Sequence, residues 1–207
     1  MKKKGMAINM RKFLSLPQEK QNRIVDSAMA FFGEVGYKKA YISEIAAAAG
    51  ISKALIFHYF GSKKGLYSYL VYYTGKIVMT EAQHDRDTVG KDYFERTAIT
   101  IKFRLSIKNR YPAMNSFMES VYNEDESEVE ADIDRLKAIA TDMHSKVDII
   151  VSEAALFKPG IDPQQVVSLI EKYTEGIVYT WNGDVSVDDT MVEVEKCLGM
   201  LKENLYK

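Results

Sequence analysis

A glycine between two short apolar segments constrains the fold of this chain most strongly. The first segment covers residues 42–49 and ends at Gly50, and the second covers residues 52–60. Alanines suit two helices that cross closely, and glycine suits a turn that needs a positive φ. The segment therefore predicts a helix-turn-helix. The apolar residues expected to fix the angle between its helices are Ile45, Ile51 and Ile56.

The rest of the chain also favours helices, because it has only four prolines and few alternating runs of β-branched residues. Residues 15–18 read as a capping box with proline in the first turn, and they predict a helix that ends at Gly36. We expect an all-α protein with a helix-turn-helix domain over residues 1–62 and a larger helical domain over residues 63–207. The later helices are expected from Ser62 and over 91–109, 112–123, 127–157, 163–182 and 188–206, with Asp162 and Ser186 capping the last two.

The net charge of −1 conceals two parts of opposite sign. Residues 1–75 hold 12 basic and four acidic residues, for a charge of +8, and the remaining residues hold 16 basic and 25 acidic residues, for −9. A basic end joined to an acidic body is typical of a polyanion-binding module attached to a domain with another role. A basic tail that only keeps the protein in solution is the alternative.

Neither a disulfide nor a metal is expected to hold the fold, because Cys197 is the only cysteine and no Cys/His cluster has zinc-ligand spacing. The sequence has no run of about 18 apolar residues, so no membrane span is predicted. Arg11 and Lys12 interrupt the place where a signal peptide would need its apolar core. We therefore expect a cytoplasmic protein that needs no cofactor.

Residues 18–72 contain an ordered set of short motifs: Phe31-Phe32, Gly36-Tyr37, Ile45-Ala46, Ala49-Gly50-Ile51-Ser52, Lys53-Ala54, Ile56-Phe57-His58-Tyr59-Phe60 and Ser62-Lys63. This set resembles the N-terminal unit of the TetR family of bacterial transcription regulators. The remainder of the chain is similar to that family in length, helical character and its closing pair of helices. The resemblance implies a DNA-binding regulator, by default a repressor, that binds a roughly palindromic operator as a homodimer and is released by a small, largely apolar effector.

The resemblance implies that the DNA contacts lie in and around the second helix of the helix-turn-helix. Lys53 and Ala54 would begin a helix that reaches base edges in the major groove, and Lys63 would hold a phosphate. Core packing for Phe57 and a solvated side chain for His58 are the alternatives. The full set expected at the DNA is Tyr41, Ser43, Ser52, Lys53, Ala54, Leu55, Phe57, His58, Tyr59 and Lys63. The basic residues Lys2, Lys3, Lys4, Arg11 and Lys12 predict a disordered arm, with phosphate or minor-groove contacts as the alternative.

Two residues depart from the family pattern. Ala54 stands where glycine is frequent, so its methyl group would either touch a thymine methyl or hinder close approach. Tyr41 stands where threonine usually caps the first helix of the motif. Either that cap is lost, at about 0.5–2 kcal/mol, or the helix starts later, at Ser43, and the Tyr41 hydroxyl reaches a phosphate.

Two amphipathic helices near residues 163–206 predict a dimer interface, because such a pair can form a four-helix bundle with a symmetry mate. The resemblance implies the same dimer, with recognition helices about 34–36 Å apart. Packing of these apolar stripes within one chain is the alternative. The residues expected at the interface are Ile170, Tyr173, Ile177, Trp181, Val194, Leu198, Leu201 and Leu205.

Aromatic and methionine side chains in the acidic body suit an adaptable pocket for an apolar effector, and they are equally ordinary core residues. The candidates are Phe103, Tyr111, Met114, Phe117, Met118, Tyr122, Met143, Tyr173 and Tyr179. Four polar residues either orient a ligand or form surface ion pairs, namely Arg104, Arg110, Glu119 and Glu175. The helix that starts at Ser62 joins both halves, so we expect it to couple effector binding to the DNA-binding helices.

An enzyme is not expected. Residues 61–65 lack the spacing of a phosphate loop, the three histidines are far apart, and no serine or cysteine nucleophile motif occurs. The expected partners are double-stranded DNA, a second copy of the chain and a small-molecule effector. The alternative is a DNA-bound structural or cell-division factor of the same fold, regulated by a protein partner and recognised by a filled core in its body.

Overall fold

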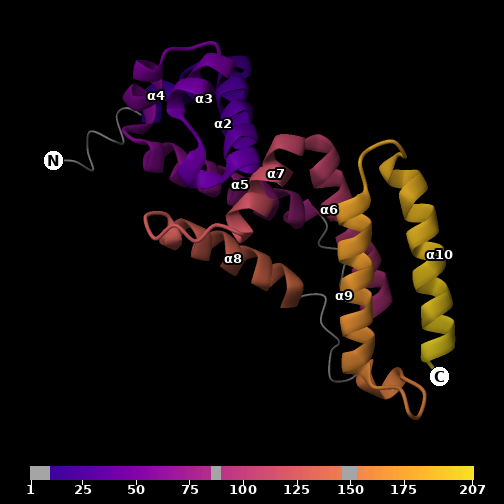
Figure 1. Ribbon diagram of the computed structural model, residues 1–207. Coiled ribbons are helices and arrows are strands. Elements are labelled where there is room, and N and C mark those ends of the chain that lie inside the picture. The colour runs from indigo at the N-terminus through magenta and orange to yellow at the C-terminus, as the bar shows by residue number, and fades with distance from the viewer. Residues whose placement is uncertain (1–9, 85–89, 146–152) are drawn as a thin grey trace. The chain divides into compact units, whose positions relative to one another are not determined.

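The computed structural model describes residues 10–84, 90–145 and 153–207 (Figure 1). Within these ranges the chain is helical apart from turns and one isolated antiparallel bridge between Phe157 and Tyr206, which confirms the all-α prediction. The elements are α2 (Gln18–Lys39), α3 (Ile42–Ala48), α4 (Lys53–Phe60), α5 (Lys63–His84), α6 (Tyr93–Arg110), α7 (Pro112–Tyr122), α8 (Glu130–Ser145), the 3-10 turn η1 (Glu153–Leu156), α9 (Pro163–Thr180) and α10 (Val187–Leu205).

The chain divides into two compact units. The first comprises the residues up to Val78 together with Tyr111–Ile139, and the second comprises Met79–Arg110 and Ala140–Lys207. The first unit therefore adds α7 and the beginning of α8 to the helix-turn-helix, and the second contains α6, α9 and α10. The boundary expected between residues 62 and 63 separates a DNA-binding domain from a regulatory domain by function. That boundary stays a prediction.

Polar caps begin several helices where the sequence predicts them. Ser52, Asp162 and Ser186 each accept a hydrogen bond from a backbone N–H in the first turn of α4, α9 and α10. The Ser62 hydroxyl does the same for α5, accepting from the N–H of Gly65 at 2.9 Å. Each cap pairs an N–H group that the helix itself leaves without a partner, which contributes about 0.5–2 kcal/mol.

The capping box predicted at residues 15–18 is wrong. Pro17 precedes α2, and no side chain caps that helix. The Ser15 hydroxyl donates instead to the carbonyl of Lys12 at 2.8 Å, because residues 10–14 form a helical turn of their own. The prediction of a disordered arm is therefore wrong for Arg11 and Lys12. The other members of that arm, Lys2, Lys3 and Lys4, lie outside the described residues.

The first unit is built on a close crossing of α2 and α7. A β-carbon on Gly33 of α2 would lie only 2.9 Å from the carbonyl carbon of Ser116 in α7, so the crossing depends on a residue without a side chain. Beside it, the ring of Tyr67 from α5 packs against Phe32 and Phe117, with ring centroids 5.1 and 5.2 Å away. All three rings are fully buried, and they form the centre of this unit's core.

The second unit has a core in which α9 and α10 pack against α6. Ile101 and Leu105 of α6 are fully buried there, together with Ile170 of α9 and Val194 of α10. Arg96 on α6 forms an ion pair with Glu153 of η1 at 2.8 Å, and the two side chains are 4% and 9% exposed. This pair ties η1 to α6.

The single helix predicted over residues 127–157 is wrong at its C-terminal end. α8 ends at Ser145, residues 146–152 lie outside the description, and Glu153–Leu156 form a 3-10 turn. The buried ion pair of Glu153 and the bridge of Phe157 hold this segment, so tertiary contacts outweigh its helical propensity.

Candidate nucleic-acid interface

The helix-turn-helix consists of α3, a turn at Gly50 and α4, as the sequence predicts. Gly50 has a φ of 67°, a conformation that glycine adopts without the strain of a β-carbon. Ile45 of α3 and Ile56 of α4 are fully buried, and Ile51 in the turn is half-buried. These residues fix the angle between the two helices and leave the opposite side of α4 in solvent.

The exposed side of α4 carries most of the residues expected at the DNA. Lys53, Ala54 and His58 are exposed, and the Phe57 ring is 38% exposed. Their spacing places them on one face of the helix. The Lys53 ammonium lies 5.8 Å from the centre of the Phe57 ring, so the apolar ring and the cation form one surface.

The buried side of α4 anchors it to the rest of the unit. Tyr59, expected near DNA, is only 7% exposed, and its ring packs against Phe13 with centroids 5.9 Å apart. Phe60 is fully buried, and Leu55 is half-buried. Tyr59 therefore supports α4 from its buried side instead of projecting from its outer face.

Three further residues expected at DNA precede α4 in the chain and are exposed, namely Tyr41, Ser43 and Ser52. Tyr41 precedes α3 and makes no capping hydrogen bond, so the cap is lost, as the first of the two alternatives predicts. α3 begins at Ile42, which rules out a later start at Ser43. The Tyr41 side chain is 66% exposed, and Ser43 and Ser52 are also exposed.

Lys63 makes contacts within the chain. Its ammonium donates to the carbonyl of Lys38 at 3.0 Å and lies 4.7 Å from the centre of the Tyr37 ring. Burial lowers the pKa of Lys63, against the opposing effect of nearby glutamates. Its expected contact with a DNA phosphate stays a prediction, and it would require exchange of these internal partners.

An acidic segment holds the end of α2 near this interface, a feature that the sequence reasoning missed. The Glu124 carboxylate accepts a hydrogen bond from the backbone N–H of Tyr37 at 2.7 Å, and Glu126 pairs with Lys38 at 3.0 Å. A signal was present in the sequence, because the acidic run 124–126 could have been matched with the basic pair Lys38 and Lys39.

The effector-binding candidates are distributed over both units. In the first unit Met114 and Phe117 are buried, Tyr111 and Met118 are half-buried, and Tyr122 is 41% exposed. In the second unit Phe103 is buried, Tyr173 is half-buried and Tyr179 is 78% exposed. The side chain of Met143 lies outside the description. Whether these residues bind an effector stays a prediction.

The polar residues near those candidates form the expected ion pairs and hydrogen bonds. Arg104 pairs with Glu175 at 2.8 Å, and Arg110 pairs with Glu81 at the same distance. Glu119 accepts a hydrogen bond from the side-chain amide of Asn115. The first two contacts follow the surface ion-pair alternative of the sequence prediction.

Several residues expected at a dimer interface pack inside the chain. Ile170, Val194 and Leu198 are at most 3% exposed, in the core formed with α6. The remaining members are partly buried against the same core: Tyr173, Ile177, Trp181, Leu201 and Leu205. α9 and α10 also carry exposed apolar side chains that were not among the residues expected at the dimer interface: Leu169, Tyr179, Val192 and Met200.

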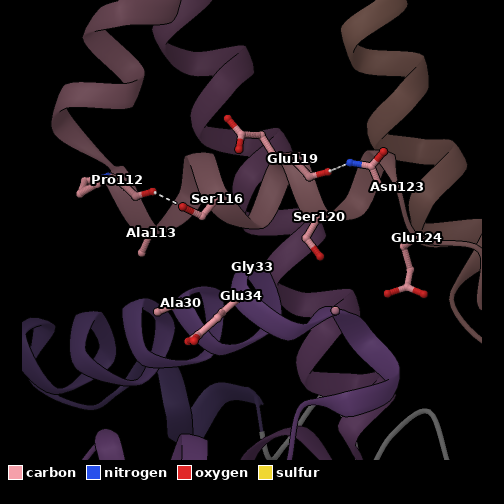
Figure 2. Close-up of a pocket in the computed structure, with 11 residues that line it drawn as sticks. Ala30, Gly33, Glu34, Pro112, Ala113, Ser116, Glu119, Ser120, Asn123 and Glu124 are labelled. Carbon is pink, nitrogen blue, oxygen red and sulfur yellow. Dashed lines mark hydrogen bonds between the residues drawn. The ribbon is translucent and has the colours of Figure 1, made fainter. Parts of the chain in front are cut away.

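A groove of about 820 Å³ lies between α2 and α7 in the first unit (Figure 2). Small residues, among them Ala30 and Gly33 of α2 and Ala113 of α7, leave this space open. Glu34 and Glu119 add carboxylates to its walls, so the groove differs from the apolar pocket expected from the sequence.

Metal sites and membrane spans are both absent from the described residues. No group of three or more His, Cys, Asp or Glu side chains in these ranges is arranged to hold a metal ion. None of the helices within them combines the length and the apolar character needed to cross a membrane.

The sequence of the helix-turn-helix matches a known family. The sequence model described as bacterial regulatory proteins, tetR family, matches residues 24–70. The HTH-type transcriptional regulator BetI of Serratia proteamaculans is 35% identical over 68 residues, which cover 31% of this chain and 34% of BetI. The chain thus matches about a third of the length of this curated relative.

The fold of the chain is similar to solved structures over most of its length. A TetR family transcriptional regulator from Chloroflexus aurantiacus has a TM-score of 0.71 at 16% identity, with 95% of this chain and 98% of that chain covered. AibR, solved in complex with isovaleryl coenzyme A and operator DNA, has a TM-score of 0.64 at 18% identity, with 88% and 97% covered. BetI and the Chloroflexus aurantiacus protein are transcriptional regulators, in line with the expectation that the chain is not an enzyme. Residues 24–70 thus match the tetR family of bacterial regulatory proteins, and the fold of the chain is similar to that of a TetR family regulator.

Proposed function

We propose that this protein is a DNA-binding transcriptional regulator whose α4 is the recognition helix. The observation that carries the proposal is the division of α4 into two sides. Ile56 and Phe60 anchor one side in the core, and Lys53 and His58 lie on the other, in solvent. A helix held in this way can enter a major groove, with its first turn against base edges. Residues 1–62 then act as the DNA-binding domain.

The protein binds DNA as a homodimer, and its operator is therefore roughly palindromic. The support is the apolar face on α9 and α10, where Leu169 and Val192 are 55% and 62% exposed in the single chain. A helix pair of this kind gains about 25 cal/mol for each Å² of apolar surface that a second copy covers. Residues 63–207 then serve as the regulatory and dimerisation domain.

We further propose that the protein represses transcription and releases DNA when it binds a small, largely apolar effector. Occlusion of RNA polymerase requires no additional surface, so a regulator that only binds DNA represses by default. AibR, a protein of similar fold, was solved with both isovaleryl coenzyme A and operator DNA, which supports ligand binding by this fold and gives no support for release of DNA. An effector that prefers the conformation with misplaced recognition helices weakens DNA binding, by about 1–3 kcal/mol in typical cases.

Selection of bound sequences from a random DNA pool, followed by a salt titration, tests the DNA-binding proposal. We expect a palindromic consensus and a steep fall of affinity with salt. Lys53→Ala should weaken binding to the selected site about 5- to 150-fold, corresponding to about 1–3 kcal/mol for a base-edge contact. Lys102→Ala removes the same charge from an exposed ion pair in the second unit and should leave affinity unchanged. Absence of binding at about 50 mM salt would refute the proposal.

Sedimentation equilibrium tests the dimer separately from DNA. Leu169→Asp and Val192→Asp each place a charge on the exposed apolar face and should convert the dimer to a monomer. Leu156→Asp is the matched control, because Leu156 is 44% exposed on η1 and should leave the dimer intact. A monomeric wild-type protein, or dimeric variants at both positions, would contradict the proposed interface.

A screen of small apolar compounds by thermal shift, followed by titration of each hit into the protein–operator complex, tests effector release. A genuine effector stabilises the protein by preferential binding to the folded state and also dissociates the complex. Compounds that shift the melting temperature without releasing DNA would count against effector control.

A further inference from the structure

The N-terminal turn of residues 10–14 is fixed against the recognition helix by an aromatic anchor. Phe13 is fully buried, and the centre of its ring lies 4.9 Å from that of Phe60 and 5.9 Å from that of Tyr59, both on α4. A third ring, that of Tyr69 on α5, packs edge-on at 5.3 Å. These contacts give the turn a defined position beside α4.

Hydrogen bonds hold the turn on the side that leads into α2. The side-chain amide of Gln21 donates to the carbonyls of Leu14 and Leu16, at 3.2 and 2.8 Å. The N–H of Ser15 donates to the carbonyl of Arg11 at 3.0 Å, which closes the turn. The end of the turn is therefore tied to the first α-helix of the DNA-binding motif.

The two basic residues of the turn point to solvent beside the outer face of α4. Arg11 and Lys12 are exposed, and neither forms an ion pair with any described residue. The Lys12 ammonium lies 3.5 Å from Nε2 of His58, which is on the exposed side of the recognition helix. Lys12 is thus held at the edge of the surface that carries Lys53 and His58, and Arg11 precedes it in the same turn.

We propose that this turn is a second DNA-contacting element, in which Arg11 and Lys12 bind backbone phosphates next to the groove that α4 enters. Phe13 is the positioning residue, because its burial fixes the turn before DNA arrives and reduces the entropy lost on binding. Contacts to phosphates add affinity and salt dependence, and they carry no base preference of their own. The proposal rests on the proposed function of α4.

The test compares the full-length wild type with Arg11→Ala/Lys12→Ala on the DNA site selected by the wild type. Each lost phosphate contact lowers the slope of log affinity against log salt by about 0.9, so the double variant should lose about 1–2 from that slope. Its selected consensus should remain that of the wild type. Lys102→Ala/Lys137→Ala removes the same charge from α6 and α8 and should keep the wild-type slope. An unchanged slope in Arg11→Ala/Lys12→Ala would overturn the proposal.

The positioning role of Phe13 needs its own comparison. Phe13→Ala should lose the same part of the slope, whereas Phe13→Leu keeps an apolar anchor and should retain it. In the Arg11→Ala/Lys12→Ala background, Phe13→Ala should reduce the slope no further, and a further reduction would refute the positioning role. If Phe13→Ala does not fold, the Arg11→Ala/Lys12→Ala variant still decides whether the turn contacts DNA. Phe13→Leu then shows whether an apolar anchor is enough to keep the salt slope.

The two proposals fail in different ways. A wild-type protein that binds no DNA refutes both the function of α4 and the role of the turn. Binding that depends on Lys53 and is insensitive to Arg11→Ala/Lys12→Ala refutes only the role of the turn.

Discussion

The α-carbon of Gly33 faces the backbone of Ser116 so closely that a β-carbon there would lie 2.9 Å from the Ser116 carbonyl carbon and 3.0 Å from the amide nitrogen of Phe117. Both near atoms belong to the backbone of α7, so a larger residue cannot be accommodated by a side-chain rotation. The Ser120 hydroxyl adds a hydrogen bond to the carbonyl of Phe32 at 2.9 Å. α7 therefore fixes the position of α2, the helix that precedes the helix-turn-helix.

Gly33→Ala should destabilise the protein by about 1–3 kcal/mol, because the added methyl group forces α2 and α7 apart. This loss outweighs the gain of about 0.5–1 kcal/mol expected when alanine replaces glycine in a helix. Urea unfolding measures the difference. Glu34→Ala, a change at the adjacent exposed position, should have little effect. A Gly33→Ala variant as stable as the wild type would show that the crossing adapts.

Glu124→Ala should destabilise the first unit by about 1–3 kcal/mol, because the backbone N–H of Tyr37 loses an acceptor 2.7 Å away. Glu124→Gln retains an acceptor oxygen without the charge, so its loss should be smaller. Asp125→Ala removes an exposed carboxylate from the adjacent position and serves as the control. Thermal unfolding of the three variants tests this order, and equal losses in all three would contradict it.

The sequence predicted those parts of the fold that depend on local patterns. Gly50 indicates a turn and Ser52 indicates a helix cap, each through the properties of its own residue type. The helix-turn-helix could therefore be located from the sequence alone. The residues expected at DNA on α4 followed from the family resemblance. The burial of Tyr59 could not be predicted in this way, because it depends on Phe13, a residue 46 positions earlier in the chain.

Contacts between distant segments account for the predictions that failed. Phe13 reads as part of a polar arm until Phe60 and Tyr69 are placed around it. Glu153 reads as the continuation of a helix until Arg96 is placed 2.8 Å away. In both cases a burial that no local spacing encodes determines the conformation of the segment.

Arg96→Met should destabilise the second unit by about 3–5 kcal/mol, because it leaves the Glu153 carboxylate buried without its ion-pair partner. Arg104→Ala is the comparison, since its partner Glu175 is 61% exposed and a surface pair contributes about 0–1 kcal/mol. Adding Glu153→Met to Arg96→Met should restore part of the lost stability. Equal costs for Arg96→Met and Arg104→Ala in urea unfolding would contradict this difference between the buried pair and the surface pair.

The protein should lose stability at alkaline pH through the half-buried phenol of Tyr69, which packs against Phe13, Phe60 and Tyr73. Burial raises the pKa of Tyr69 from 10.0 to about 12, with smaller contributions from Tyr73 and Tyr72. The phenol group then favours the folded state fully below about pH 10, and this contribution is lost as the pH rises toward about 12.

Urea unfolding between about pH 8 and about pH 11 measures this loss as a falling free energy of unfolding. Tyr69→Phe removes the titrating group and should flatten the fall over that interval. Tyr72→Phe removes a phenol that is 59% exposed on the same helix, so that variant should follow the wild type. Because several other tyrosines are also buried, part of the alkaline fall should persist in Tyr69→Phe, and the decisive quantity is the difference between the two variants. Coincident curves for Tyr69→Phe and Tyr72→Phe would exclude Tyr69 as a source of the alkaline sensitivity.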